Sequence, residues 1–170
     1  MTLTELNALP REASDVWFYS TCGCQHWAQA MSAGRPYTTV AQIKQAATAN
    51  WQRLSAEHML EAFAAHPMIG DMSTLKAKFA NTKDMASNEQ SGTSVASDST
   101  LKALHQANHE YLDKNGFIFI ICATGLSAEH MLNELKVRLN NDSSSEIKNA
   151  ANEQIKITLL RINKGIVEEQ

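Results

Sequence analysis

A histidine at the end of an apolar helical stripe is the first residue with a type and position suited to chemistry. Met59, Phe63 and His66 are spaced at i, i+4 and i+7, so His66 closes the stripe just before Pro67. One interpretation is a hydrogen-bonded histidine at the edge of the core. The other is a histidine that faces a pocket and moves a proton near neutral pH. The pattern alone leaves both open.

An arginine shares a second stripe, in the expected last helix. Ala150, Gln154, Ile157 and Arg161 fall on one helical face, which predicts that Arg161 points inward. A buried arginine must be paired, because an unpaired buried charge is costly. It forms either an intramolecular salt bridge or a site for an anion such as a carboxylate, whose shape matches the guanidinium.

Other candidate groups carry less information. Glu89-Gln90 lies in a polar stretch and, from the residues alone, is typical of a solvated helix start. Cys22, Cys24 and His26 are ligand types, but their spacing matches no common zinc pattern, so no metal site is predicted. No phosphate-binding loop, dinucleotide fingerprint or serine-hydrolase elbow is present in the sequence.

These residues must be positioned by helices, because capping residues and helical periodicity dominate the sequence. Thr2–Glu5 fits a capping box, and the other expected helix signals are N-caps at Ser55, Asp98 and Ser127 and a C-terminal stop at Asn115-Gly116. Residues 117–122 (FIFIIC) form a short apolar run that is either one buried strand or a buried extended segment. We expect one all-α domain over residues 1–170, a bundle of about eight helices with this one buried extended segment. The expected helices run from Thr2 to just before Pro10, and over Glu12–Tyr19, Gln25–Ala33, Thr39–Trp51, Ser55–Ala65, Asp98–Lys114, Ser127–Asn140 and Ser144–Ile162.

Composition excludes several classes of protein. Of the 170 residues, 44% are hydrophobic and 19% are charged, which is typical of a globular domain. The net charge of -3 lacks the basic excess of proteins that bind nucleic acids or membrane surfaces. No apolar run approaches the roughly 20 residues that span a bilayer. The first residues resemble no secretory signal, and the three cysteines suit a reduced compartment. We therefore expect a cytoplasmic protein with neither nucleic-acid nor membrane partners.

Several strings, in order and spacing, resemble one known family. They are Cys22-Gly23, Ala65–Asp71 (AHPMIGD), Glu89-Gln90, Phe117–Gly125 (FIFIICATG), and Arg138-Leu139-Asn140 followed by Glu146, Ala150 and Arg161. The family is the 2-oxo-4-hydroxy-4-carboxy-5-ureidoimidazoline (OHCU) decarboxylases of urate breakdown. The resemblance extends from about Leu6 to Ile162.

This resemblance implies an all-α, cofactor-free lyase that acts on an anionic ureidoimidazoline, yields (S)-allantoin and CO2, and forms a homodimer. His66 matches the catalytic histidine and Glu89 its acidic partner, while Gln90 and Arg161 match substrate-binding residues. Many members have serine at Ala86, and Ser87, one step later, is the candidate for that contact. The other residues expected to line the substrate site are Pro67, Phe117, Ile118 and Ile121.

Two alternatives to this function remain. The chain could be a non-catalytic helical interaction module in which His66 and Arg161 are structural. It could also be a diverged lyase or hydrolase that acts on a related ureido compound. Within the decarboxylase interpretation, His66 either takes the proton of the substrate hydroxyl or gives one to the ring carbon.

Overall fold

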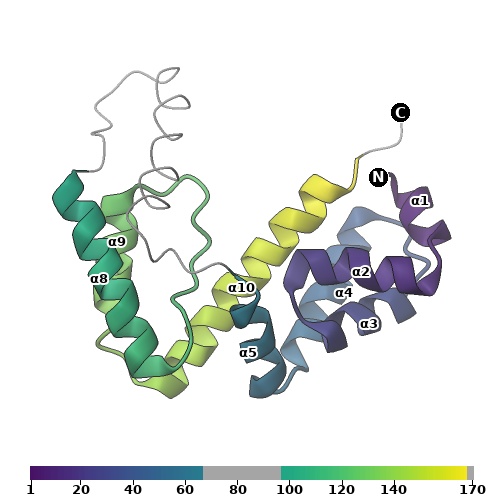
Figure 1. The fold of residues 1–170 in the computed structure, drawn as a ribbon. Coiled ribbons are helices and arrows are strands. Elements are labelled where there is room, and N and C mark those ends of the chain that lie inside the picture. The colour runs from purple at the N-terminus through teal and green to yellow at the C-terminus, as the bar shows by residue number, and fades with distance from the viewer. Residues whose placement is uncertain (67–96, 168–170) are drawn as a thin grey trace, which may run out of the picture. The chain divides into compact units, whose positions relative to one another are not determined.

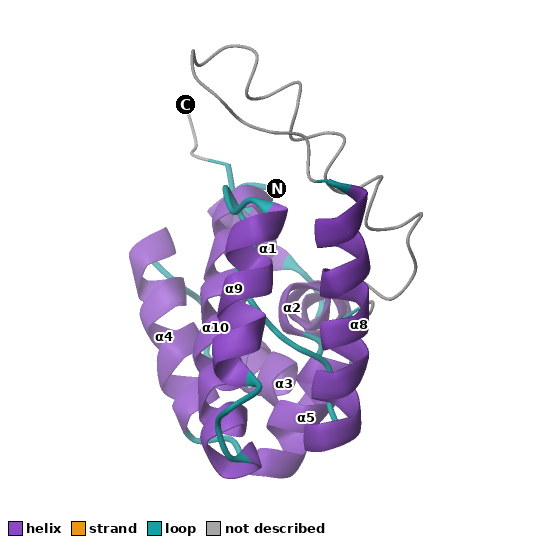
Figure 2. Cartoon of the chain, turned by 90° about the vertical axis from the view of Figure 1, so that its left-hand side faces the viewer, coloured by secondary structure: helices purple, strands orange, loops and turns teal. Residues whose placement is uncertain are grey.

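The computed structural model describes residues 1–66 and 97–167, and these form helices joined by loops, without a strand (Figures 1 and 2). The all-α prediction is confirmed. The helices of the described residues are α1 (Leu3–Ala8), α2 (Arg11–Cys22), α3 (Gln25–Ala33), α4 (Val40–Gln52), α5 (Ala56–Ala64), α8 (Asp98–Asn115), α9 (Ala128–Arg138) and α10 (Ser143–Gly165). None of the helices in these two ranges is long and apolar enough to cross a membrane.

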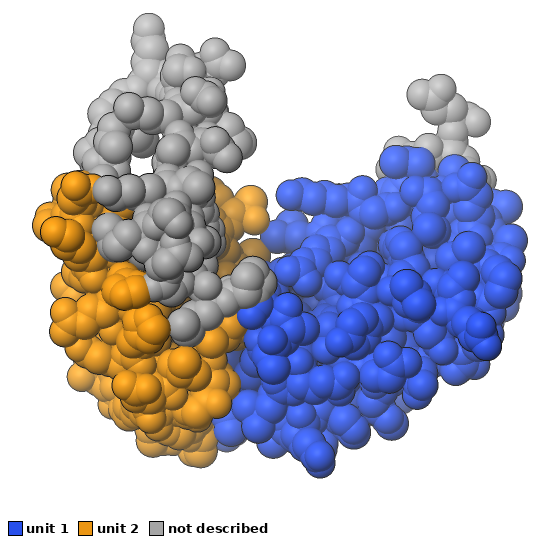
Figure 3. Space-filling view, in the orientation of Figure 1, with its two compact units in different colours: residues 1–66, 147–170 blue, residues 67–146 orange. Residues whose placement is uncertain are grey.

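The chain divides into two compact units, coloured separately in Figure 3. Unit 1 contains Met1–His66 and Ile147–Gln170, and unit 2 contains Pro67–Glu146. Helix α10 begins in unit 2 and has most of its length in unit 1. The expectation of one domain over residues 1–170 stays a prediction.

Side-chain caps begin the helices where the sequence predicts them. Thr2 Oγ1 accepts from the backbone N–H of Glu5, whose carboxylate accepts from the N–H of Thr2, so the predicted capping box is present. Ser55 caps α5 and Ser127 caps α9 in the same way, each accepting from the backbone N–H three residues later.

Several helix ends differ from the prediction, and α10 continues past Ile162 to Gly165. Ser97, not Asp98, caps α8, because its hydroxyl accepts from the N–H of Thr100 and leaves Asp98 in the first turn. Helix α2 continues past Tyr19 to Cys22 and ends at the left-handed Gly23. Helix α9 ends at Arg138 rather than Asn140.

Aromatic side chains form the core of unit 1. Phe18 makes edge-to-face contacts with Trp27 and Tyr37, with ring centroids 6.0 and 6.3 Å apart. The Trp27 indole donates to the Ala47 carbonyl, and that of Trp51 donates to the Ala151 carbonyl at 3.0 Å. These indole contacts join α3 to α4 and α4 to α10, and so fix the helix that carries Gln154 and Arg161.

Residues 117–122 in unit 2 form neither helix nor strand. Phe117, Phe119 and Ile120 are buried, whereas the other three residues of the segment are half-buried. The segment is therefore an extended connection between α8 and α9 with part of its side chains inside the unit. The short apolar run lacks a strand partner among the described residues, which is why no sheet forms here.

Candidate functional site

His66 lies directly after α5, at a close approach between the ends of two helices of unit 1. Its backbone N–H donates to the carbonyl of Phe63, which continues the last turn of α5. Gly23, at the end of α2, has φ of +81°, and a Cβ there would lie 2.5 Å from the Cβ of Ala65. Glycine is required at this position for both reasons, because it permits the left-handed turn and lets the end of α2 approach the residue before His66.

The His66 ring is held by a neutral amide from α10. Nε2 of His66 and Oε1 of Gln154 lie 2.5 Å apart. The Gln154 amide nitrogen donates to the backbone carbonyl of Cys22 at 3.2 Å and to the hydroxyl of Thr158 at 3.3 Å. Gln154 and Thr158 are fully buried, while His66 is half-buried. The histidine is thus the outer end of a buried polar chain.

Burial lowers the pKa of His66 below its ordinary value of 6.5. The hydrogen bond with Gln154 acts in the opposite direction, and the positive charge of Arg161 lowers the pKa further. His66 is therefore neutral at neutral pH, the form in which an imidazole can accept a proton.

Arg161 is placed differently from the prediction. It is exposed, and its Nη1 donates to the Thr21 carbonyl at 3.2 Å, next to the Cys22 carbonyl that binds Gln154. Within residues 1–66 and 97–167 Arg161 makes no ion pair with a carboxylate. A guanidinium has five N–H donors, and this contact uses one of them.

The prediction that the inward stripe of α10 includes Arg161 is therefore wrong. The buried positions of the helix in unit 1 are Ala150, Ala151, Gln154, Thr158, Ile162 and, just after it, Ile166. The buried positions follow one another mostly in steps of four residues, and each such step turns 400°, about 40° more than one full turn. The buried stripe therefore moves around the helix along its length, and Arg161 lies at its margin. The prediction missed the drift because Thr158, a polar residue, occupies a core position.

Cys22 contributes its carbonyl rather than its thiol. Burial raises the pKa of the Cys22 thiol to about 12, although a hydrogen bond with Thr158 opposes this. Since the thiolate is the reactive form, Cys22 is unsuited to act as a nucleophile. In the part of the chain that the structure describes, no three His, Cys, Asp or Glu side chains gather as metal ligands.

The candidates of the extended segment belong to unit 2. Phe117 is buried and packs edge-to-face on Tyr111, with ring centroids 5.8 Å apart, whereas Ile118 and Ile121 are half-buried. The segment is anchored through its backbone, because Nη1 of Arg138 donates to the Ile120 carbonyl at 2.7 Å.

Arg138 is part of a buried network that sequence reasoning did not assign. Its Nε donates to Glu146 at 2.7 Å, and the hydroxyl of Tyr111 donates to the same carboxylate oxygen at 2.5 Å. Asn141 donates to the other carboxylate oxygen at 2.8 Å. Burial raises the pKa of Tyr111, and the bond to Glu146 adds to this effect, so the phenol remains a donor.

Four of the predicted site residues, Pro67, Ser87, Glu89 and Gln90, lie outside the described residues. Of the rest, the structure brings His66 and Arg161 to the same end of α2. The prediction missed the roles of Gln154, Thr158 and the Cys22 carbonyl. The available signal was Gln154 itself, a polar side chain on an apolar stripe that must find hydrogen-bond partners.

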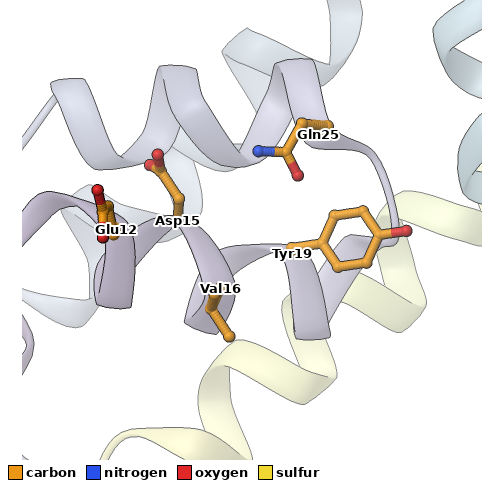
Figure 4. A pocket seen from close by; sticks show the side chains of 5 residues that line it. All are labelled: Glu12, Asp15, Val16, Tyr19 and Gln25. Carbon is orange, nitrogen blue, oxygen red and sulfur yellow. The ribbon is translucent and has the colours of Figure 1, made fainter.

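A separate shallow cavity of about 250 Å³ lies on α2 and the start of α3 (Figure 4). Its lining residues are Glu12, Asp15, Val16, Tyr19 and Gln25, none of which was predicted to act. None of these lining side chains is cationic, and Asp15 already pairs with Arg11 at 3.2 Å, so the cavity offers no positive charge to an anionic ligand. It is therefore unsuited to the anionic substrate expected from the sequence.

Comparison with known sequences places this chain among related proteins. A family model described as OHCU decarboxylase matches residues 7–163. The uric acid degradation bifunctional protein TTL of Arabidopsis thaliana is 36% identical over 143 residues, which are 84% of this chain and 44% of that protein. The chain thus spans less than half the length of this relative. A 2-oxo-4-hydroxy-4-carboxy-5-ureidoimidazoline decarboxylase of Haloferax volcanii is 23% identical over 99% of this chain and 98% of its own length.

Solved structures show a related fold. A crystal structure of an OHCU decarboxylase in the presence of (S)-allantoin has a TM-score of 0.71 and 34% identity, covering 88% of this chain and 96% of that one. A crystal structure of an (S)-allantoin synthase has a TM-score of 0.74 at 19% identity, covering 98% of this chain and 54% of that one. The second likeness is one of fold alone.

Proposed function

The chain belongs to the OHCU decarboxylase family, and we propose that it converts 2-oxo-4-hydroxy-4-carboxy-5-ureidoimidazoline into (S)-allantoin and CO2 in urate breakdown. The family match covers nearly the whole chain, and the solved structure that is 34% identical in sequence is matched over 96% of its length. The observation that carries the proposal is the half-buried His66, which is bonded to Gln154 and lies within reach of the positive charge of Arg161 in unit 1.

The reaction can proceed without a cofactor, because the substrate carries its own electron sink. The bond from the ring carbon to the carboxylate breaks as CO2 leaves, and its electron pair forms a C=C bond to the neighbouring ring carbon. The electron pair of the former C=N bond moves to the ring nitrogen, which takes up a proton. The enol that remains becomes a carbonyl when the hydroxyl loses its proton and one face of the ring takes a proton. The protein must bind the anion, move these protons and select that face.

His66 is the proposed proton-transfer group. A histidine with a lowered pKa is in its base form at neutral pH, so the assignment we favour is acceptance of the substrate hydroxyl proton. Such a group supplies about 10²- to 10⁴-fold in rate. Arg161 then binds the substrate carboxylate through donors that the Thr21 contact does not use.

The remaining assignments rest on the sequence resemblance. Glu89 is the acidic partner in catalysis, Gln90 and Ser87 bind the substrate, and Pro67 lines the site with the extended segment through Phe117, Ile118 and Ile121. We also propose that the protein works as a homodimer in the cytoplasm. A solution mass of twice 18.8 kDa by light scattering is the expected result, and a monomer at working concentration would contradict it.

Polarimetry on freshly generated substrate tests the activity. The wild-type protein should produce (S)-allantoin faster than the spontaneous decay, and His66→Asn should reduce the reaction to that decay and give racemic product. His26→Asn, which changes an exposed histidine of the same unit, is the control and should behave as wild type. Racemic product from the wild-type protein at the spontaneous rate would refute the proposal and favour a non-catalytic interaction module.

Substitution of Arg161 separates binding from chemistry. Arg161→Lys keeps the charge but loses the planar fork, so we expect KM to rise about tenfold with little change in kcat, the effect of about one charged hydrogen bond. Arg53→Lys, at an exposed arginine of unit 1, is the control. Unchanged kinetic constants in Arg161→Lys would make Arg161 a structural residue.

A further inference from the structure

The hydrogen bonds around Gln154 determine which nitrogen of His66 carries the hydrogen. One Gln154 amide atom lies 3.2 Å from the backbone carbonyl oxygen of Cys22, and the other lies 2.5 Å from Nε2 of His66. A carbonyl oxygen can only accept a hydrogen bond, so the amide atom that faces Cys22 must be the NH2 group. The amide oxygen therefore faces the histidine.

The same reasoning applies to the ring. An amide oxygen accepts and cannot donate, so Nε2 of His66 must carry a hydrogen for the two atoms to lie 2.5 Å apart. A neutral imidazole has one N–H, and its lone pair for accepting a proton then belongs to Nδ1. Gln154 is fully buried and also bonded to Thr158, so water cannot readily replace its contacts or permit the reverse orientation.

We propose that Gln154 is a positioning residue that holds neutral His66 in the tautomer with hydrogen on Nε2, so that Nδ1 is the atom that exchanges the proton with the substrate. The catalytic half of this statement rests on the proposed decarboxylase function. The tautomer is a property of the protein alone and can be measured without substrate.

The assignment also limits what Glu89 can do. A carboxylate that fixed the tautomer from the other side of the ring would have to accept a hydrogen from Nδ1. A neutral ring with its hydrogen on Nε2 offers none there. The proposal therefore leaves Glu89 for contacts to the substrate rather than for orienting the imidazole.

Replacement of Gln154 by glutamate should change the pKa of His66, an effect that a purely structural role of Gln154 would not predict. The groups that act on His66 in unit 1 are Arg161, whose charge opposes protonation, and Gln154, while the Cys22 thiol is bonded to Thr158. In Gln154→Glu a carboxylate would accept from Nε2 and stabilise the charged imidazolium, so the pKa of His66 should rise. Gln154→Leu removes the acceptor and leaves both tautomers accessible.

Nitrogen NMR of histidine-labelled protein tests the tautomer directly, with His66→Asn used to assign the signal. Above its pKa, wild-type His66 should show a protonated Nε2 and a bare Nδ1, and Gln154→Leu should shift the populations toward the other tautomer. A wild-type ring with hydrogen on Nδ1, or a Gln154→Leu spectrum identical to that of wild type, would overturn the proposal.

Kinetics test the positioning role, with far-UV circular dichroism to verify folding. Gln154→Leu should lower kcat about 10- to 100-fold, as loss of a group that orients a reacting histidine does, with KM nearly unchanged. Gln154→Glu should retain more activity and move the acidic limb of its pH profile to higher pH. Asn152→Asp, which adds the same charge on the exposed side of α10, should leave that limb in place.

The two kinds of failure are distinguishable. If the wild-type protein shows no decarboxylation, the proposed function and the catalytic half of the inference fail together, and the NMR result still decides the tautomer. If the wild-type protein is active but Gln154→Leu matches its kcat, the positioning role is refuted and the function stands.

Discussion

The two units bury their polar side chains in opposite ways. In unit 1 a neutral chain of amide, hydroxyl and carbonyl groups leads from the core to His66. In unit 2 the buried network is ionic, with the Arg138 and Glu146 side chains 8% and 0% exposed and 2.7 Å apart. The guanidinium also lies over the ring of Phe119, 4.7 Å from its centroid.

The difference matches two roles. His66 in unit 1 must change its charge during the proposed reaction, whereas Arg138 and Glu146 in unit 2 must keep theirs. A buried ion pair is costly to form and more costly to break, because loss of one partner leaves the other charge buried without compensation. The hydrogen-bond partner of His66, Gln154, is neutral, so a change in the charge of His66 breaks no ion pair. The ionic network in unit 2 instead fixes the backbone of the extended segment through Ile120.

Removal of the unit 2 carboxylate should have the largest effect on stability. Glu146→Ala leaves Arg138 buried without its ion-pair partner and leaves Tyr111 and Asn141 without their acceptor, so we expect a loss of about 3–5 kcal/mol in the free energy of unfolding. Urea denaturation followed by circular dichroism measures it. Lys156→Gln, which breaks an exposed ion pair on α10, is the control and should change the free energy by less than about 1 kcal/mol.

A loss as small as that of the control would show that Arg138 finds another partner or water once the carboxylate is gone. The contrast between the two networks would then fail, since the ionic one would be as easily rearranged as a surface pair. Glu146→Gln adds a finer comparison, because it keeps the shape and removes only the charge.

Local signals in the sequence predicted most of the fold. Thr2, Ser55 and Ser127 each place a hydroxyl where the first N–H groups of a helix need an acceptor, and Gly116 ends α8 in the left-handed conformation. These interactions span three or four residues, so a single sequence contains them. The choice of Ser97 over Asp98 as a cap was beyond this reasoning, because both side chains can cap a helix.

The candidate site was predictable only in part, because its contacts are distant along the chain. The stripe makes His66 a candidate without deciding its role. Its partner Gln154 is 88 residues away, and the Gln154 contact to Cys22 spans 132 residues. Periodicity shows which face a residue occupies and not what it meets there. The error at Arg161 has the same origin, since the width and drift of the buried stripe depend on how the neighbouring helices pack.

The protonation of His66 should make the stability of unit 1 depend on pH near neutrality. Because burial lowers the pKa of His66 in the folded protein, the unfolded chain binds the proton more tightly between the folded pKa and 6.5. This contribution to stability is complete above pH 6.5 and is lost as the pH falls through the folded pKa.

We therefore expect the free energy of unfolding of wild type to fall between about pH 7 and pH 5 more steeply than that of His66→Asn. Urea midpoints of the two proteins, measured across this range, provide the comparison. Parallel curves for wild type and His66→Asn would mean that His66 does not titrate differently on folding.

The smallest effect concerns the cysteines, whose reactivity should distinguish the two units without changing stability. Cys22 and Cys24 in unit 1 are 1% and 0% exposed, and burial raises the pKa of both thiols, whereas Cys122 in unit 2 is half-buried. Because alkylation requires an accessible thiolate, iodoacetamide at about pH 8 should modify Cys122 first in the native protein and reach the other two only on unfolding. Peptide mapping by mass spectrometry measures the order of modification.

Labelling of Cys22 as fast as Cys122 would show that the end of α2 opens in the native protein. The buried chain of hydrogen bonds from Cys22 to His66 would then be open to water as well.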